Sequence, residues 1–267
     1  IRRQRQMCIR DRNKTIAIIT GASAGLGKEF VRILAERSEL DEIWAIARNE
    51  QKLQALTEEY GEKVRTFSKD LSDRKQIEQF GEILQHENVS IRYLINNAGF
   101  ARFCSYNDLS IEESCNMINL NINGLVAMGL ICIPYMKKGS HLINIASQAS
   151  FQPLPYQNIY SSTKAFVRNY TRALNVELRD RGIVATAVCP GWMKTDLIDK
   201  GLIGADKATS RFRMMVTPDV VAEKAIRDAD KNKDISVYGL YVKTAHAVAK
   251  LLPQRLMMKI WLLQQHL

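Results

Sequence analysis

Short apolar runs alternate along the chain with longer amphipathic stretches. Runs rich in β-branched residues, typical of strands, lie at 15–20, 42–47, 64–68, 93–96, 141–146, 183–189 and 235–239. Segments with helical periodicity lie near 26–37, 50–60, 73–86, 110–136, 158–181 and 217–231. Strands that alternate with helices form βαβ units around a buried parallel sheet. The pattern predicts an α/β fold: one doubly wound domain with a mostly seven-stranded parallel sheet and helices on both faces.

The two ends of the chain differ from this body. Residues 1–12, "IRRQRQMCIRDR", lack the apolar stretch and cleavage site of a secretory signal, so we interpret them as an extraneous or disordered segment. The domain is expected over 13–242. Residues 243–267 form a basic tail predicted to be an amphipathic helix. Its apolar stripe has leucine or isoleucine at 252, 256, 260, 263 and 267, and Met257 and Trp261 widen it. We expect this tail to dock on the body or on another subunit, with membrane-surface contact as the less favoured alternative.

The net charge of +10 is concentrated at the ends of the chain. Residues 1–12 carry +4 and residues 243–267 another +4, which leaves only +2 for the body. Because no recognisable nucleic-acid motif accompanies this charge, we expect no nucleic-acid partner. Apolar residues make up 46% of the chain, and no unbroken apolar run approaches the ~18 residues of a membrane span.

The five cysteines are scattered along the chain, and none belongs to a C-x-x-C pair. An odd, dispersed set argues against a disulfide framework and against a zinc site. It fits a reducing compartment. The sequence therefore predicts a cytoplasmic protein with no bound metal.

A glycine-rich turn follows the first predicted strand. In "TIAIITGASAGLGKEF", Gly21, Gly25 and Gly27 lie between the strand and a helix. Glycine lets backbone N–H groups approach a pyrophosphate, and the start of the helix adds a partial positive charge. The alternative is a tight turn that binds nothing, but the strand–turn–helix context favours a dinucleotide site.

The end of the second strand bears on which dinucleotide binds. An acidic residue there would accept hydrogen bonds from the ribose 2′-hydroxyl of NAD, but the sequence has Ala47 followed by Arg48. A guanidinium can form two hydrogen bonds to the 2′-phosphate of NADP. An exposed arginine without a ligand is the alternative. We predict NADP as the cofactor, with NAD as the less favoured choice.

Tyr160 and Lys164 are four residues apart at the start of a predicted helix, so they share one helix face. Reduction of a ketone needs a hydride at carbon and a proton at oxygen, and a tyrosine is neutral and able to donate at pH 7. An ammonium ~4 Å away would contribute roughly 4 kcal/mol at an effective dielectric of 20, enough to lower a pKa by two to three units. The alternative is an aromatic core residue beside a solvated lysine.

These features together resemble the short-chain dehydrogenase/reductase family. The resemblance extends over residues 14–240 and rests on six motifs in the family's order and spacing: "TGASAGLG" (20–27), "NNAG" (96–99), "NING" (121–124), Ser147, "YSSTK" (160–164) and "PGWMKTD" (190–196). It implies a Rossmann fold.

The family resemblance also implies the site residues. Tyr160 would be the catalytic acid/base and Lys164 its partner, Ser147 would bind the substrate oxygen, and Asn121 would hold a water in a proton relay. Cofactor-binding residues would be Gly21, Ser23, Ala24, Gly25, Leu26, Gly27, Arg48, Asp70, Leu71, Asn97, Ala98, Gly99, Tyr160, Lys164, Pro190, Gly191 and Thr195. Ala24 departs from the basic residue that NADP-preferring relatives often carry, so the NADP prediction depends mainly on Arg48.

The substrate pocket is expected from three segments, 100–106, 147–156 and 190–216, of which the last is long enough to act as a lid. They supply mostly apolar side chains, which suit a lipophilic carbonyl: Phe100, Phe103, Phe151, Pro153, Leu154, Pro155, Tyr156, Trp192, Met193, Leu197, Ile198, Met214 and Met215.

The leading hypothesis is an NADP(H)-dependent oxidoreductase that transfers a hydride between nicotinamide and a small-molecule carbonyl or secondary alcohol. Two alternatives remain: a 3-oxoacyl thioester reductase, in which Arg168 and Arg172 would meet an acidic carrier protein, and a non-catalytic NADP-binding sensor. The family resemblance implies a homo-oligomer, a dimer or tetramer.

Overall fold

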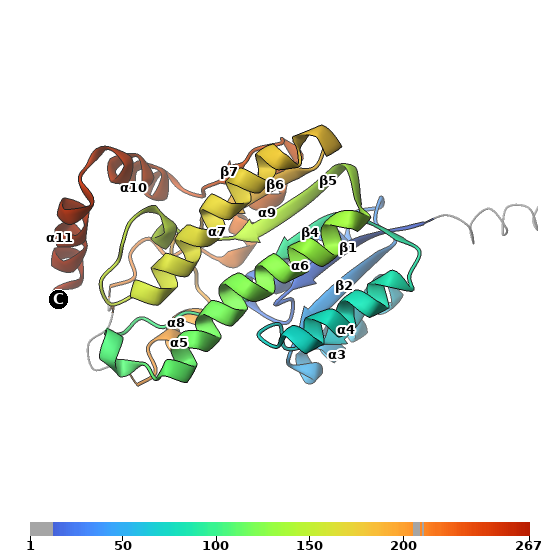
Figure 1. Cartoon of the computed structure of the whole chain (residues 1–267), viewed down its shortest axis with the longest axis horizontal. Coiled ribbons are helices and arrows are strands. Elements are labelled where there is room, and N and C mark those ends of the chain that lie inside the picture. Colours follow the sequence, from blue (N-terminus) through green and yellow to red (C-terminus); the bar gives the residue numbers. More distant parts are fainter. Residues whose placement is uncertain (1–12, 205–208, 210) are drawn as a thin grey trace, which may run out of the picture.

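The computed structural model describes residues 13–204, 209 and 211–267 of the chain (Figure 1). Its centre is a seven-stranded sheet in the order β3-β2-β1-β4-β5-β6-β7, with every neighbouring pair parallel. The strands are β1 (Lys14–Thr20), β2 (Glu42–Ala47), β3 (Val64–Ser68), β4 (Val89–Asn96), β5 (Met136–Ile145), β6 (Val184–Val188) and β7 (Ile235–Ser236). The predicted fold is confirmed. The last strand is shorter than the sequence pattern indicates.

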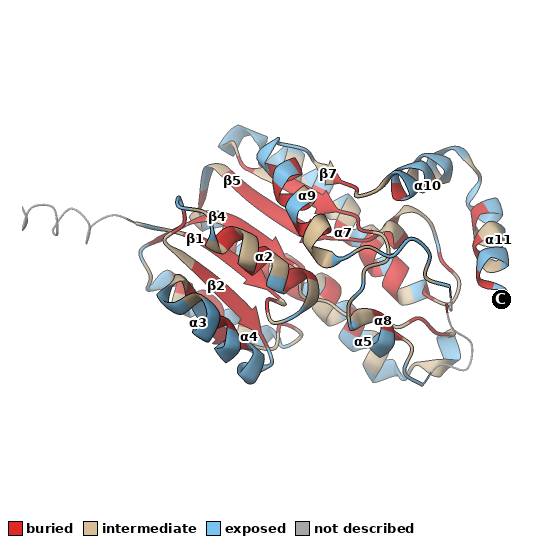
Figure 2. Ribbon diagram, turned by 180° about the vertical axis from the view of Figure 1, so that it is seen from behind, coloured by how far each residue is buried: buried red, intermediate tan, exposed pale blue. Residues whose placement is uncertain are grey.

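Helices cover both faces of this sheet (Figures 1 and 2). The set comprises α2 (Gly25–Ala35), α3 (Glu50–Tyr60), α4 (Arg74–Gln85), α5 (Ile111–Ile118), α6 (Leu125–Cys132), α7 (Asn158–Glu177), α8 (Leu197–Gly201), α9 (Pro218–Asp230), α10 (Leu240–Leu251) and α11 (Gln254–Gln265). Helices α2, α3 and α9 pack on one face, and α4, α6 and α7 on the other.

The strand sequences explain why both faces are covered. Successive side chains of a strand point to opposite faces, so a strand buried on both sides must be apolar throughout. In β1, Ala17 and Ile19 enter the core under α2, α3 and α9, whereas Ile16 and Ile18 enter the core under α4, α6 and α7. Figure 2 shows the strands buried along most of their length, with the outer sides of α3 and α4 exposed.

A continuous helical stretch, Ile111–Tyr135, crosses the α4/α7 face. It joins α5 to α6 through a π-helical turn, Asn119–Gly124. This stretch is long and apolar enough to cross a membrane by composition, with a mean hydropathy of 1.6 in its most apolar window. Of that window 39% is buried, and Met128 and Cys132 are fully buried against the sheet.

The tail forms two helices, α10 and α11, at the same end of the molecule as α5 and α8 (Figure 1). The first of them begins at Leu240, so it crosses the predicted boundary at 242/243. On α11 the side chains of Met257, Trp261 and Gln265 are buried, and Leu263 is exposed. The proposed N-terminal segment 1–12 lies outside the described residues.

Candidate active site

A cavity of about 790 Å³ opens at the carboxyl ends of the strands. Strand order reverses between β1 and β4, and ligands of open parallel sheets bind in the crevice at such a point. Most of the predicted site residues line this cavity: Gly21, Ala24, Gly25, Leu26, Arg48, Asp70, Asn97, Ala98, Gly99, Ser147, Tyr160, Lys164, Pro190, Gly191 and Thr195. Ser23, Gly27, Leu71 and Asn121 are not among the lining residues.

The glycine turn between β1 and α2 is shaped by close backbone approaches. Gly21 and Gly25 have positive φ angles, +63° and +51°, which residues with a Cβ adopt at a cost. A Cβ on Gly21 would lie 2.9 Å from the Ala98 Cα, and one on Gly27 only 2.0 Å from the Gly21 carbonyl oxygen. Gly27 therefore serves the turn by letting α2 approach it, although its own atoms do not line the cavity.

The N-terminus of α2 faces this turn with unsatisfied donors. Its N-cap residue, Ala24, makes no side-chain hydrogen bond to the first turn, which contains no acidic residue. The first N–H groups of a helix need partners from outside the helix, and together with the helix dipole they attract anions. The turn and the uncapped helix, both of which border the cavity, fit the pyrophosphate of a dinucleotide.

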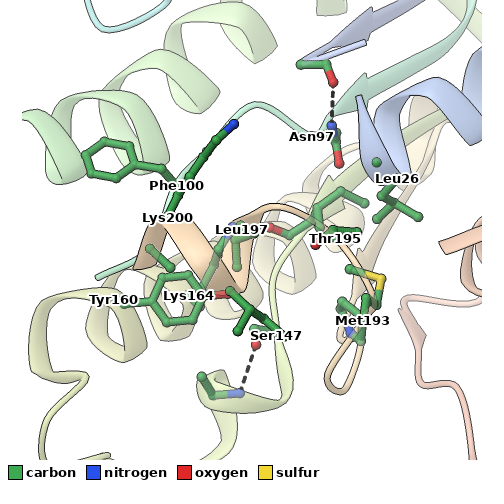
Figure 3. Close-up of a pocket in the computed structure, with 18 of the residues that line it drawn as sticks. Leu26, Asn97, Phe100, Ser147, Tyr160, Lys164, Met193, Thr195, Leu197 and Lys200 are labelled. Atoms are coloured by element: carbon green, nitrogen blue, oxygen red, sulfur yellow. Dashed lines mark hydrogen bonds between the residues drawn. The ribbon is translucent and has the colours of Figure 1, made fainter. Parts of the chain in front are cut away.

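Hydrogen bonds between Thr20, at the end of β1, and Asn97, directly after β4, hold the glycine turn in place. The Asn97 Nδ2 donates to the carbonyl oxygens of Thr20 and Gly21, each at 3.1 Å. The Thr20 Oγ1 accepts from the backbone N–H groups of Asn97 and Ala98, each at 3.0 Å. Asn97 lines the cavity as predicted, and its amide nitrogen is engaged with the turn (Figure 3).

Arg48, which follows β2, and Asp70, which follows β3, are an ion pair that lines the cavity. The Arg48 Nη1 lies 3.6 Å from the Asp70 Oδ2, and the arginine side chain is 70% exposed. Partial burial works to raise the pKa of Asp70, but hydrogen bonds from Ser72 and the charge of Arg48 outweigh it and hold the pKa below its usual value. The exposed Arg48 guanidinium and the ionised Asp70 carboxylate thus lie where the sequence predicts that the adenosine part of the cofactor binds.

Ser147, Tyr160 and Lys164 come together on one side of the cavity (Figure 3). Ser147 follows β5. Its Oγ accepts from the Ala149 N–H at 3.1 Å, and its hydroxyl is also hydrogen-bonded with Tyr160. Tyr160 and Lys164 lie one turn apart on α7, as their spacing predicts. The Lys164 Nζ donates to the Ile145 carbonyl at 2.7 Å and lies 5.9 Å from the centre of the Tyr160 ring.

The electrostatics of this trio differ from the sequence prediction. Burial raises the pKa of Tyr160, and a hydrogen bond with Ser147 offsets only part of the rise, whereas we expected Lys164 to lower it. Burial also lowers the pKa of Lys164 to about 8. The sequence argument counted the attraction between the two groups but not the desolvation of both. The phenol is consequently held in the neutral form, which is the form that donates a proton.

Asn121 lies in the π-helical turn and is buried behind the cavity. Its Oδ1 accepts from the Phe100 N–H at 3.0 Å, and its Nδ2 donates to the Phe100 carbonyl at 3.0 Å and the Thr163 Oγ1 at 3.1 Å. The side chain thereby fixes the loop after β4 against the catalytic helix. The proton relay through a water at Asn121 stays a prediction.

The substrate end of the cavity is only partly as expected. Six of the predicted apolar residues line it: Phe100, Leu154, Trp192, Met193, Leu197 and Ile198. Phe103 is buried behind them, with its ring edge-on to Tyr160 at 5.6 Å. Phe151 stacks on His246 of α10 at 3.8 Å, and Met214 and Met215 are exposed. Pro153, Pro155 and Tyr156 are not among the lining residues.

Sequence reasoning missed several residues that line this end. Trp261 reaches the cavity from the tail, and the polar side chains of Arg102, Glu113, Gln148 and Gln157 also border it. Trp261 belonged to the predicted apolar stripe of the tail, but the pattern gave no sign of which partner that stripe would meet. Within residues 13–204, 209 and 211–267 no group of three His, Cys, Asp or Glu side chains could hold a metal.

The chain is similar to known oxidoreductases. The family model of short chain dehydrogenases matches residues 15–202. An uncharacterized oxidoreductase of Staphylococcus aureus (strain USA300) is 28% identical over 231 residues, covering 85% of this chain and 96% of that protein. A short-chain dehydrogenase from Sphingobium yanoikuyae in complex with NADPH has a TM-score of 0.74 at 27% identity, covering 91% and 95% of the two chains. The closed form of a serine dehydrogenase complexed with NADP⁺ has a TM-score of 0.72 at 30% identity, covering 84% and 94%.

Proposed function

The chain belongs to the short-chain dehydrogenase family, and we propose that within this family it is an NADP(H)-dependent reductase of lipophilic carbonyl compounds. The observation that carries the proposal is the meeting of Ser147, Tyr160 and Lys164 in one cavity with the glycine turn. An oxidoreductase needs a cofactor site and a proton donor that face the same substrate atom. A non-catalytic sensor would need only the first.

The chemistry divides between cofactor and protein. A bound nicotinamide supplies or accepts the hydride at the substrate carbon. The Tyr160 hydroxyl donates a proton to the carbonyl oxygen, and the Ser147 hydroxyl turns from Tyr160 to donate a hydrogen bond to the same oxygen. The ammonium of Lys164 stabilises the phenolate that remains, since a nearby opposite charge favours the ionised form.

The raised pKa of Tyr160 favours the direction of reduction. Reduction starts from the neutral phenol, whereas oxidation of an alcohol starts from the phenolate, which burial disfavours. The ammonium of Lys164 must also be present, and its pKa of about 8 keeps it largely charged at neutral pH. Both directions share one transition state. The pKa of Tyr160 therefore changes the fraction of enzyme that carries the phenol in the required protonation state, which is larger for reduction than for oxidation.

Support for NADP comes from Arg48 and from two relatives. The guanidinium borders the cavity and is mostly exposed, so it is able to turn from Asp70 to a 2′-phosphate. The Sphingobium yanoikuyae dehydrogenase was solved with NADPH and the serine dehydrogenase with NADP⁺. No acidic residue directly follows β2 to accept hydrogen bonds from the ribose 2′-hydroxyl of NAD, which also favours NADP.

Support for a lipophilic substrate comes from the walls beside Tyr160. Phe100, Leu154, Trp192, Leu197 and Ile198 offer no charge to a polar ligand. The thioester alternative relied on two arginines of α7. Arg172 is paired with Asp234 at 2.7 Å, and the Arg168 guanidinium lies over the Phe151 ring at 5.6 Å, so both are already engaged.

A panel of aryl and alkyl ketones together with 3-oxoacyl thioesters, assayed with NADPH and with NADH by the cofactor's absorbance, tests the proposal. We expect turnover of apolar ketones with NADPH. Turnover of thioesters alone would favour the second reaction class. Tight NADPH binding without turnover of any carbonyl would contradict an enzymatic role.

A further inference from the structure

The tail contributes a wall to the substrate end of the cavity. Trp261 of α11 is among the lining residues, and only 7% of it is exposed. Its Nε1 donates a hydrogen bond to the Pro155 carbonyl at 3.0 Å. A buried indole N–H needs such a partner, and here the bond fixes the orientation of the ring. Trp261 lies beyond residues 15–202, the part of the chain that the family model matches.

The surroundings of the indole connect it to the reacting group. Trp261 belongs to one apolar cluster with Leu154, Ile198 and Tyr160, and this cluster covers the carboxyl end of the sheet beside the cavity. Pro155 lies in the loop that leads into α7, five residues before Tyr160. The ring therefore borders the space on the substrate side of the phenol. On the same helix Leu263 points away and is 76% exposed.

Two further contacts hold this wall in place. Gln265 accepts from the Arg211 N–H at 2.9 Å and donates to the Arg211 carbonyl at 3.2 Å, which joins α11 to the segment after α8. Gln157 donates to the Thr209 Oγ1 at 2.8 Å, which joins that segment to the start of α7. The tail, the segment after α8 and the catalytic helix are thus connected through named hydrogen bonds.

We propose that Trp261 is a specificity-determining residue of this enzyme: its indole forms the fixed apolar wall that limits the size of the group flanking the carbonyl. The proposal rests on the proposed reductase function. A large ring with two rotatable bonds loses little conformational entropy when held, so it makes a rigid boundary. The wall favours flat, apolar flanking groups, such as an aryl ring, that stack on the indole, and it excludes longer or branched groups.

Variants of the full-length enzyme test this with aryl alkyl ketones of increasing alkyl length at saturating NADPH. One methylene in an apolar pocket changes kcat/KM about 10- to 200-fold. Trp261→Ala should therefore raise the ratio of kcat/KM for the longest ketone to that for the shortest at least about 10-fold. Trp261→Phe, which keeps a ring and loses the bond to Pro155, should shift the ratio less and in the same direction.

Controls separate a wall from a packing residue. Leu263→Ala, on the exposed side of the same helix, should leave the ratio and the melting temperature unchanged. The dissociation constant for NADPH should be the same in all three variants, since Trp261 is a substrate-side residue. Equal loss of activity toward every ketone in Trp261→Ala, with the ratio unchanged, would show that the indole only supports the fold and would overturn the proposal.

A readout without turnover keeps the two proposals distinguishable. The chain has three tryptophans, so 5-fluorotryptophan labelling gives a simple ¹⁹F spectrum, with the Trp261 signal assigned from Trp261→Phe. Addition of the shortest aryl alkyl ketone, which the wall admits, to the NADP⁺ complex should shift that signal. A shifted signal without turnover would contradict the reductase function and support the role of Trp261 as a wall of the binding site. An unmoved signal would contradict that role of Trp261.

Discussion

The two ends of the cavity are built on different principles. At the cofactor end, Thr20 closes β1, and the glycine turn and Asn97 directly follow the neighbouring strands β1 and β4. Hydrogen bonds that involve backbone atoms hold them together. At the substrate end, Trp261 and Leu154 come from a tail helix and a loop, and they meet mainly through apolar packing and one hydrogen bond. The sheet fixes the first end, and the packing of peripheral segments shapes the second.

This difference indicates that members of one family share the cofactor end of the cavity and differ at the substrate end. A parallel sheet sets the register of its strand ends, so sequences that form this sheet and also carry the glycine turn present nearly the same cofactor cradle. Loops and tails tolerate substitution and insertion, because they contribute fewer ladder hydrogen bonds. Changes at the cofactor end should therefore affect every substrate equally, whereas changes at the substrate end should reorder substrates.

Lys164 lies where the two ends meet, and its loss should have the largest effect. Lys164→Ala should lower kcat about 10²- to 10⁴-fold, the usual contribution of acid–base catalysis, and should also weaken NADPH binding. The pKa of Lys164 is about 8, so the ammonium is present below that pH and is lost above it. Carbonyl reduction by the wild type should fall as pH rises through about 8. In Lys164→Arg the fall should move to higher pH, because a guanidinium remains charged.

Steady-state rates between pH 6 and pH 10 provide the measurement. A profile that is flat through pH 8, or unchanged in Lys164→Arg, would contradict this role for the ammonium.

Gly27 tests the cofactor end alone. A methyl group there would lie 2.0 Å from the Gly21 carbonyl, so the turn must move away from α2. Overpacking of this kind costs about 1–3 kcal/mol. Because NADPH binding requires the original turn, this strain opposes binding and lowers NADPH affinity by up to about 100-fold. The selectivity among ketones should be unchanged wherever activity persists.

Gly81→Ala on α4 is the matched control. A methyl group there would lie no closer than 3.4 Å to Ile131, and replacement of a helical glycine by alanine stabilises by about 0.5–1 kcal/mol. Isothermal titration with NADPH checks both variants. Undiminished affinity in Gly27→Ala would contradict the assignment of the cradle.

Arg48 should have the smallest effect and the most selective one. Arg48→Ala should weaken NADPH binding about 10-fold and leave NADH binding unaltered, since only NADPH carries the 2′-phosphate. The estimate is modest because the side chain is largely exposed. Arg74→Ala, another exposed arginine, serves as the control. An equal loss for both cofactors would remove the basis for the NADP assignment.

The fold and most of the cofactor end could be predicted from the sequence. Continuous Val- and Ile-rich runs specify a parallel sheet, and its strand ends bring Gly21, Asn97 and Ser147 to one edge. The i, i+4 spacing placed Tyr160 and Lys164 on one helix face. These are consequences of local periodicity and sheet geometry, which the sequence carries directly.

The substrate end could not be predicted to the same extent. The contact between Trp261 and Pro155 joins segments 106 residues apart with no strand register to align them. Phe103 and Trp261 are both aromatic residues in apolar segments, yet only Trp261 lines the cavity. The pKa of Tyr160 was predicted in the wrong direction because spacing shows which charges are near and does not show how far both groups are removed from water.

Tyr160→Phe tests the central claim most directly, because it removes one hydroxyl and keeps the ring that packs against Phe103. Turnover of the best ketone and the dissociation constant for NADPH should be measured on the same preparation. We expect turnover to fall by about 10² to 10⁴, with NADPH affinity and melting temperature within a factor of two and about one degree of the wild type. Retained turnover in Tyr160→Phe would contradict the account, because the proton would then come from another group.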